Sequence, residues 1–292
     1  MPALPTMSTS TTGATSETIV AALKLASAAT LASVVSLGVL AKVRAHRKAS
    51  DPFASTRTTT SKEKDSSTAE RRAAALVLTA HPDDESYFFA PTVQALKRSG
   101  AEVHLVCLSD GAAGGDGETR KAELLKVKEL LELEGLCIVD TDDLRDGMET
   151  QWPAKTVMAV LDAYTEGAPV KFDYVVTFDG RGVSGHVNHI ATYEGTRQWI
   201  EEKRNGPGAS SDLPQVWVLE STNLVRKLSG ALDFAMSYLE TLTSSRRVFV
   251  PSPSPRQVVA AVRLHKSQFV WYRKLFLAFS RYTFMNTLRR ID

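Results

Sequence analysis

Beyond residue 72 the chain alternates short apolar runs with longer segments of helical periodicity. The apolar runs lie at residues 75–79, 102–108, 136–140, 174–178, 216–219 and 247–250. Helical segments separate several of them, at residues 89–98, 119–133, 153–164 and 189–202. Strands that alternate with helices form a parallel sheet, because each return to the same edge of the sheet needs a crossover. The sequence therefore predicts an α/β domain of the Rossmann-like type, a mostly parallel sheet with helices on both faces.

The first apolar run ends in a polar cluster, His-Pro-Asp-Asp-Glu at residues 81–85. This position is the carboxyl end of a strand, where open α/β sheets bind their ligands. A second cluster, His-Val-Asn-His, follows much later at residues 186–189. Either cluster alone has an ordinary interpretation, as helix-capping acids or surface histidines. Together, histidines and carboxylates on separate segments predict a metal site with nitrogen and oxygen ligands, for which zinc is the leading candidate.

The composition excludes several other classes of protein. The 292 residues carry a formal net charge of only +2, which argues against a dedicated nucleic-acid binder. The two cysteines, Cys107 and Cys137, lie within apolar runs and indicate a reducing compartment rather than a disulfide framework. The glycine-rich residues 109–120 match neither a Walker A loop nor a dinucleotide-binding loop, but their N–H groups suit a phosphate or sugar hydroxyls. Protein partners are not identifiable from one chain.

The first 72 residues divide into three parts. Residues 1–17 are rich in Ser and Thr and are expected to be disordered, and residues 42–72 are expected to be a disordered basic and polar tether. Between them, residues 18–41 are long and apolar enough for a transmembrane anchor helix. Positive charges follow this segment, so the positive-inside rule places its C-terminal side in the cytosol. A cleaved signal peptide fits less well because its basic N-terminal region is missing, and a mitochondrial presequence is a further alternative.

Several blocks of sequence carry a family resemblance. They read Leu-Val-Leu-Thr-Ala-His-Pro-Asp-Asp-Glu at 76–85, Leu-Ser-Asp-Gly at 108–111 with Arg-Lys-Ala-Glu-Leu at 120–124, Gly-Val-Ser-Gly-His-Val-Asn-His at 182–189, and Ser-Gln-Phe-Val-Trp-Tyr at 267–272 with Ser-Arg-Tyr at 280–282. Together they resemble the PIG-L/LmbE-like family of zinc deacetylases. The resemblance implies an LmbE-like catalytic domain over residues 73–292 and zinc-dependent removal of acetyl from N-acetylglucosaminyl-phosphatidylinositol, an early step of GPI-anchor biosynthesis. It also implies a single-pass protein of the endoplasmic reticulum membrane whose catalytic domain faces the cytosol and acts on a glycolipid.

The resemblance also assigns roles to residues of the two polar clusters. His81, Asp84 and His189 match the family's metal ligands, and three protein ligands with one open position are typical of catalytic zinc. Another divalent metal such as Fe2+ is the alternative. Asp83 is implied to be the general base that takes a proton from the attacking water. His186 is implied to stabilise the oxyanion of the tetrahedral intermediate as an imidazolium.

Other residues complete the expected pocket. Arg120 matches a family arginine that contacts the polar head of the substrate, and residues 146–152 follow another apolar run and are expected to line the site. Residues 264–291 interleave aromatic and basic side chains at helical spacing, so a C-terminal helix is expected there, either resting in a lipid interface or packed on the domain. The remaining histidines are expected to be structural: His46, His104 and His265.

Three alternatives stay open at this point. An LmbE-like enzyme would apply the same chemistry to a soluble N-acetylglucosamine conjugate. An iron oxygenase with two histidines and one carboxylate would also use His81 and Asp83, but such enzymes are built on all-β barrels. A non-catalytic membrane scaffold would keep the fold without activity, although the intact set of site residues argues against it.

Overall fold

A computed structural model describes residue 53 and residues 71–113, 116–207, 209 and 211–291 of the chain. The expected anchor at residues 18–41 and nearly all of the expected tether lie outside these ranges. Within them, no helix is both long and apolar enough to cross a membrane. The described residues of the expected tether contact the domain. Phe53 is buried, and its ring packs edge-on against Tyr174 with the ring centroids 5.5 Å apart. The guanidinium groups of Arg71 and Arg72 donate to the carbonyl oxygens of Lys171 and Gly100, each at 2.9 Å.

The described residues form a sheet of seven strands in the order β3-β2-β1-β4-β5-β7-β6. The strands are β1 (Ala74–Thr79), β2 (Glu102–Cys107), β3 (Gly135–Ile138), β4 (Tyr174–Phe178), β5 (Gln215–Leu219), β6 (Arg247–Pro251) and β7 (Met285–Arg290). The strands from β3 to β5 pair in parallel, and β7 runs antiparallel to both of its neighbours. Every residue of β1 is buried, as expected for a strand covered on both faces. The predicted mostly parallel sheet is confirmed.

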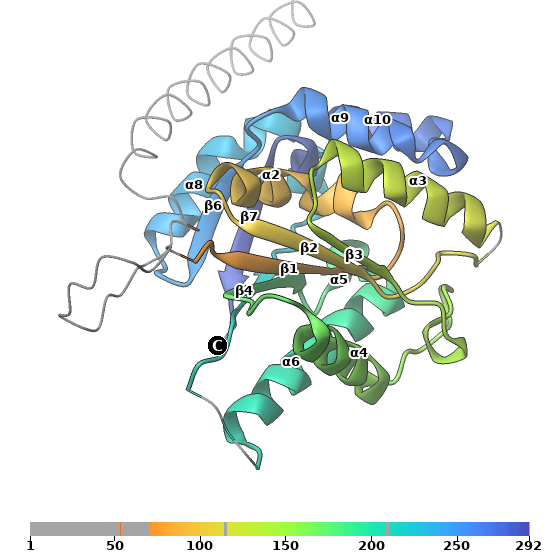
Figure 1. The fold of residues 1–292 in the computed structure, drawn as a ribbon. Helices are drawn as coiled ribbons and strands as arrows, with labels where there is room; N and C mark the ends of the chain where they lie inside the picture. Colours follow the sequence, from red (N-terminus) through yellow and green to blue (C-terminus); the bar gives the residue numbers. More distant parts are fainter. Residues whose placement is uncertain (1–52, 54–70, 114–115, 208, 210, 292) are drawn as a thin grey trace, which may run out of the picture.

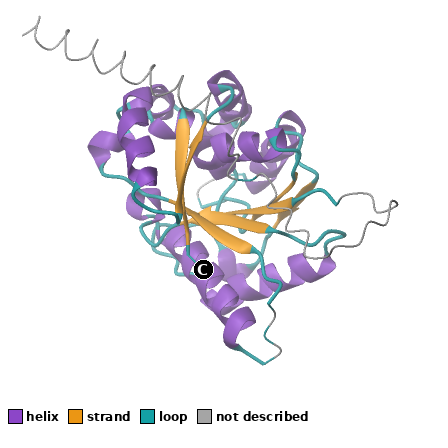
Figure 2. Cartoon of the chain, turned by 90° about the vertical axis from the view of Figure 1, so that its left-hand side faces the viewer, coloured by secondary structure: helices purple, strands orange, loops and turns teal. Residues whose placement is uncertain are grey.

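Helices cover both faces of this sheet (Figure 1). One face carries α2 (Ala90–Arg98), α3 (Gly117–Leu130), α9 (Pro255–Leu264) and α10 (Trp271–Phe279), and the other carries α4 (Ala154–Gly167) and α6 (Val187–Asn205). A view turned by a quarter shows the twisted strands between layers of helices (Figure 2). The four helices predicted between the apolar runs are all present. Shorter helices follow β4 and β5: α5 (Gly182–Gly185), α7 (Leu224–Lys227) and α8 (Phe234–Leu242).

Local sequence signals explain where two of these helices begin. Asp116 is the N-cap of α3, and its carboxylate accepts the N–H groups of Glu118 at 3.1 Å and Thr119 at 3.2 Å. Ser254 is the N-cap of α9, where Pro255 occupies the first helical position and needs no hydrogen-bond partner for its nitrogen. These caps satisfy N–H groups that a helix start otherwise leaves unpaired.

The strand order creates a crevice at the ends of β1 and β4. The chain leaves β1 for β2 and β3 on one side and then returns to β4 on the other side, so these two neighbouring strands have diverging connections. Open α/β sheets bind ligands at such a switch point, outside the carboxyl ends of the strands. Residues 80–85 follow β1 and residues 179–189 follow β4. The fold therefore brings the two polar clusters of the sequence to one place.

The C-terminal segment differs from the single helix that its periodicity predicts. α10 covers only Trp271–Phe279, and residues 285–290 form β7, which inserts between β5 and β6. The helix ends because Ser280 adopts an extended conformation, and its hydroxyl accepts the N–H of Tyr282 at 3.1 Å to start a short 3-10 turn. Tyr282 and Leu288 are then fully buried. Burial and sheet pairing override helical periodicity here.

Candidate metal centre

A sharp turn after β1 presents the first polar cluster. Asp83 has a φ of 128°, a backbone conformation that residues with a side chain rarely adopt. The turn folds the carboxylate of Asp84 back onto the strand end, where its Oδ2 accepts the N–H groups of Ala80 at 3.1 Å and His81 at 2.8 Å. A π-helical turn, Glu85–Phe89, follows, and such turns are frequent at functional sites. The backbone thus fixes the position of Asp84.

Three side chains converge at the switch point: His81, Asp84 and His189. Their ligand atoms lie within 4.8 Å of one another, and all three residues are buried. Oδ1 of Asp84 lies 3.2 Å from Nε2 of His189, and Oδ2 lies 3.6 Å from Nδ1 of His81. The structure therefore brings together the three residues that the sequence predicts as metal ligands.

The hydrogen bonding of His189 fits a bound cation. Its Nδ1 lies 3.1 Å from the carbonyl oxygen of Gly182, which only accepts hydrogen bonds, so a neutral ring carries its proton on Nδ1. Nε2 then presents a lone pair toward Asp84 and has no hydrogen-bond partner among the described residues. A buried nitrogen without a partner is costly unless a ligand binds it. Two imidazoles and a carboxylate are suitable donors for Zn2+ or Fe2+.

The charges around the three ligands also favour a cation. Burial alone would raise the pKa of Asp84, but the imidazoles of His189 and His81 hold it well below its ordinary value. Burial alone would lower the pKa of His81, yet the carboxylates of Asp146 and Asp84 raise it to about 10. The negative charge of these carboxylates attracts a proton to His81, and it attracts a metal ion beside His81 in the same way.

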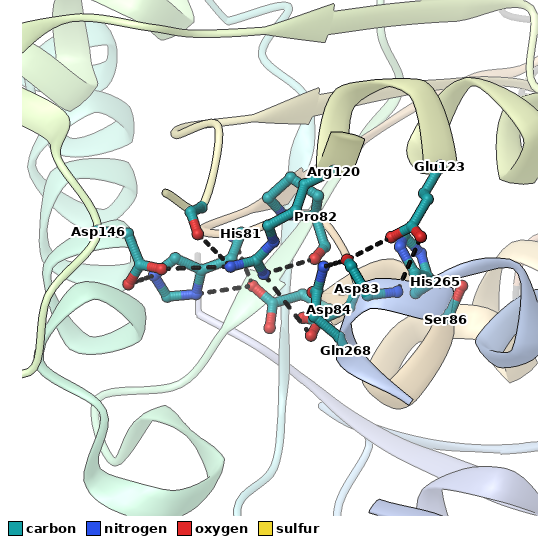
Figure 3. Close-up of polar contacts among 12 residues, drawn as sticks. His81, Pro82, Asp83, Asp84, Ser86, Arg120, Glu123, Asp146, His265 and Gln268 are labelled. Carbon is teal, nitrogen blue, oxygen red and sulfur yellow. Dashed lines mark hydrogen bonds and ion pairs between the residues drawn. The ribbon is translucent and has the colours of Figure 1, made fainter. Parts of the chain in front are cut away.

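Asp146 joins the site from the loop after β3 (Figure 3). Its Oδ1 lies 3.0 Å from Nε2 of His81, and Oδ1 of Asn188 lies 3.1 Å from the same nitrogen. A carboxylate on the outer nitrogen of a ligating histidine orients the ring. Asn188 also accepts the N–H of Gly147 at 3.2 Å, which ties this loop to the start of α6. The sequence predicts these loop residues only as pocket lining. The position of Asp146 after a strand is the signal that could have indicated a direct contact with the site.

His186 is the N-cap of α6, and its Nδ1 accepts the N–H of Asn188 at 3.3 Å. Its ring stacks on His189 with the centroids 4.8 Å apart. Burial, together with the charges of His81 and His189, lowers the pKa of His186 to about 4. The ring is therefore neutral near pH 7, which differs from the expected imidazolium. Because Nδ1 accepts a hydrogen bond, the neutral ring carries its proton on Nε2 and is still a donor.

Asp83 lies beside the ligands and faces two arginines. Its Oδ2 forms an ion pair with Arg273 and lies 3.7 Å from Nη2 of Arg120. Burial raises the pKa of Asp83, and the negative charge of Asp84 acts in the same direction, while the arginines oppose both. A carboxyl group with a raised pKa is suited to accept and release a proton. Sequence reasoning missed Arg273, which lies 190 positions from Asp83 and is brought to it by α10.

Arg120 lines the pocket, and its guanidinium braces the surrounding loops (Figure 3). Nη2 donates to the carbonyl oxygen of Pro82 at 2.8 Å, and Nη1 donates to the carbonyl oxygen of Gly111. Nη1 also lies 3.5 Å from Oδ2 of Asp146. The guanidinium therefore links the turn after β1 to the glycine-rich loop. A contact between Arg120 and a substrate stays a prediction.

His265, which the sequence predicts only as a structural residue, contacts the site through Glu85. Nε2 of His265 lies 2.7 Å from Oε1 of Glu85, and both side chains are completely buried. Oε2 of Glu85 accepts the N–H of Asp83 at 3.0 Å. His265 thus holds Glu85, and Glu85 stabilises the strained backbone of Asp83 through this hydrogen bond.

The site opens into a pocket of about 300 Å3. Its polar wall holds the candidate ligands with Asp83, Arg120 and Asp146. The lining also contains an aromatic wall, formed by Tyr87, Phe88, Tyr272 and Phe276. A pocket lined by both polar groups and aromatic rings suits a sugar with an apolar attachment.

These features define an α/β protein with a candidate catalytic metal centre at the switch point of its sheet. The PIG-L family, described as GlcNAc-PI de-N-acetylase, matches residues 76–200. The N-acetylglucosaminyl-phosphatidylinositol de-N-acetylase of Bos taurus is 36% identical over 213 residues, which cover 72% of this chain and 81% of the relative. A probable enzyme of the same name from Schizosaccharomyces pombe is 34% identical over 218 residues, with coverage of 72% and 84%. The chain belongs to the PIG-L family.

Solved structures share the fold at low sequence identity. The N,N'-diacetylchitobiose deacetylase of Pyrococcus horikoshii has a TM-score of 0.53 at 15% identity, over 75% of this chain and 83% of that one. The 4-carboxy-2-hydroxymuconate hydratase GalB of Pseudomonas putida has a TM-score of 0.50 at 15% identity, over 75% and 96%. Because a deacetylase and a hydratase share this fold, the fold alone does not determine the reaction.

Proposed function

We propose that this protein removes the acetyl group from N-acetylglucosaminyl-phosphatidylinositol and releases glucosaminyl-phosphatidylinositol and acetate, an early step of GPI-anchor biosynthesis. The observation that carries the proposal is the convergence of His81, Asp84 and His189 beside Asp83 at the switch point. The chain is also 36% identical to the Bos taurus protein named N-acetylglucosaminyl-phosphatidylinositol de-N-acetylase. The aromatic wall of the pocket supports a substrate that is partly apolar.

The metal is proposed to be zinc, held by the three candidate ligands. Two imidazole nitrogens and one carboxylate oxygen are a common donor set of catalytic zinc, and Fe2+ is the alternative that accepts the same donors. When bound, the metal supplies a Lewis acid that polarises the acetyl carbonyl and lowers the pKa of water. Elemental analysis of the purified protein distinguishes the two metals.

The chain's own residues supply the proton transfers. Asp83 accepts a proton from water while the water oxygen adds to the amide carbon. Asp83 then delivers that proton to the amide nitrogen as the C–N bond breaks. His186 donates a hydrogen bond from Nε2 to the oxygen of the tetrahedral intermediate. Asp146 and Arg120 line the same pocket and would hold the polar part of the substrate.

A location at the endoplasmic reticulum membrane is part of this proposal. The apolar residues 18–41 would serve as a single transmembrane anchor, and the basic residues after them favour a catalytic domain on the cytosolic side. A membrane location gives the enzyme access to a substrate whose acyl chains stay in the bilayer. Protease protection of the full-length chain in sealed microsomes tests the orientation.

Acetate release from N-acetylglucosaminyl-phosphatidylinositol by the purified full-length chain tests the proposed reaction. Asp83→Asn is the matched variant, because it removes the base while keeping the size of the side chain. We expect release by the wild type and a loss of more than about 100-fold in the variant. Cleavage of soluble N-acetylglucosamine conjugates alone would favour the soluble LmbE-like enzyme. No cleavage of any substrate by metal-loaded protein would favour the scaffold.

A further inference from the structure

Exposed apolar side chains gather in two segments of the described chain. Of the fourteen large apolar side chains that are strongly exposed there, seven lie in residues 224–242 and five in residues 270–279. We call these two segments the apolar rim. The side chains are Leu224, Val225, Leu228, Leu232, Met236, Leu239, Leu242, Val270, Trp271, Tyr272, Leu275 and Phe279. Soluble proteins rarely expose so concentrated an apolar surface without a binding function.

The two segments of the apolar rim meet one another. A side chain built on Gly230 would come within 3.5 Å of the carbonyl oxygen of Phe279, so the backbone between α7 and α8 abuts the end of α10. Both segments also contact the same 3-10 turn, Arg281–Thr283. The exposed apolar side chains of the two segments therefore lie on adjoining parts of the molecule.

One segment of the apolar rim lines the pocket, and the other begins close to it. On one side, Nζ of Lys227 donates to the carbonyl oxygen of Val183 at 2.5 Å, next to the pocket-lining Ser184. On the other side, Tyr272 and Phe276 of α10 line the pocket themselves. An apolar partner that touched both segments would therefore lie beside the pocket.

α10 is held to the domain by one face and exposes the other. Phe276 packs against Tyr87 and Phe88, with ring centroids 6.0 and 6.1 Å away, and Leu277 is buried. Trp271 is 72% exposed on the same helix. α10 is therefore packed on the domain, and its other face is exposed to solvent.

Charge indicates what kind of partner fits the apolar rim. Residues 263–279 contain four arginines and lysines and no acidic residue. Arg273 is ion-paired with Asp83, which leaves Arg263, Lys266 and Lys274 to meet a partner. In the other segment both acids, Asp233 and Glu240, are ion-paired with Arg226. Exposed Trp, Tyr and Leu with basic neighbours are the composition of surfaces that rest in the head-group region of anionic bilayers.

We infer that the apolar rim docks the catalytic domain on an anionic phospholipid bilayer, so that the pocket mouth faces the membrane surface. The inference rests on the proposed function, because the substrate would then present its sugar to the pocket while its acyl chains stay in the bilayer. Docking adds a second membrane contact, made by the folded domain itself, to any N-terminal anchor.

The fluorescence of Trp271 tests the contact directly. Of the four tryptophans of the chain, all within the described ranges, Trp152, Trp199 and Trp217 are buried and only Trp271 is exposed. The full-length chain is reconstituted in vesicles of phosphatidylcholine and phosphatidylinositol, with bromine atoms on the acyl chains near the head groups. We expect bromine to quench the wild type but not Trp271→Phe. If the wild-type protein is in the vesicles and Trp271 is not quenched, the inference is overturned. Another part of the protein, such as residues 18–41, would then be the candidate to cover α10.

The double variant Leu232→Glu, Leu239→Glu tests whether docking serves catalysis. We expect kcat/KM for vesicle-borne substrate to fall about 10-fold or more, because two glutamates oppose apolar burial and anionic lipid. A short-chain substrate analogue in solution should be cleaved within about 2-fold of the wild-type rate, since surface changes away from the pocket perturb the fold little. Leu125→Glu is the matched control, because Leu125 is 52% exposed against 55% for Leu239 but lies outside the apolar rim.

Each outcome is informative. An equal loss on both substrates, or an equal effect of Leu125→Glu, would overturn the inference, because the apolar rim would then matter for folding rather than docking. If the wild type cleaves neither substrate, the proposed function fails, and the quenching of Trp271 still decides whether the domain docks.

Discussion

The guanidinium of Arg273 is ion-paired with the carboxylate of Asp83, the acid that precedes the candidate ligand Asp84. Arg273 also lies over the ring of Tyr87, with its central carbon 5.4 Å from the ring centroid. α10 thus presents Trp271 to the outside and Arg273 to the site. This arrangement connects the proposed membrane surface to the acid that we expect to transfer the proton.

Replacement of Arg273 by Gln should lower kcat by about 10- to 100-fold, because the buried carboxylate of Asp83 loses a charge-assisted hydrogen bond that orients it. The measurement is steady-state acetate release by the purified full-length protein. Arg256→Gln is the matched control, since Arg256 is exposed on α9 and lies outside both the pocket lining and the apolar rim. Equal kcat values for wild type and Arg273→Gln would show that the ion pair does not position Asp83.

Replacement of His265 by Gln should lower kcat by about 10-fold while metal content stays at the wild-type level, because the partner of Glu85 supports a catalytic residue rather than a ligand. His104→Gln is the control: His104 is also buried and bonded, to Tyr164 at 2.9 Å, but lies away from the site. Metal analysis and kinetics on the same samples provide the test. A loss of metal in His265→Gln, or an equal fall of kcat in both variants, would contradict the positioning role.

Glu134 should make folding stability depend on pH. Burial alone would raise its pKa, but Lys97, whose Nζ lies 2.6 Å away, and the N–H of Val103 at 2.8 Å outweigh this and lower it. A carboxyl group with a lowered folded-state pKa stabilises the protein above its unfolded pKa of about 4.3, and this stabilisation is lost as the pH falls through the folded value.

The variant Glu134→Gln should therefore melt about 1–3 °C below the wild type near pH 7, and the difference should vanish in strong acid. Thermal unfolding at several pH values checks this. A difference in Tm that stays constant with pH would show that Glu134 contributes through packing rather than charge.

Sequence patterns predict six of the seven described strands and miss β7, whose signal is not local. Residues 75–78 are apolar throughout because β1 is covered on both faces, and that run was recognisable as a strand. Residues 285–290 read Met-Asn-Thr-Leu-Arg-Arg, and one β-branched residue without apolar alternation does not mark them as β7. Their conformation depends on pairing with β5 and β6, which no local window contains.

The same distinction applies to the site. His81, Asp84 and His189 follow strand ends, and a parallel sheet brings the ends of adjacent strands together, so their convergence was predictable. Arg273 and His265 reach the site only through the packing of the C-terminal helices, and their sequence neighbours carry no catalytic signature. The neutral state of His186 was also out of reach, because its pKa depends on burial and on two other histidines.

The most direct test of the account is to titrate metal into chelator-treated, full-length protein while measuring acetate release from N-acetylglucosaminyl-phosphatidylinositol. The account predicts that activity is absent after chelation, returns in proportion to added Zn2+ up to about one equivalent, and does not return in His189→Ala. Full activity in protein free of bound metal, or restoration of His189→Ala to the wild-type rate, would contradict a catalytic metal centre formed by His81, Asp84 and His189.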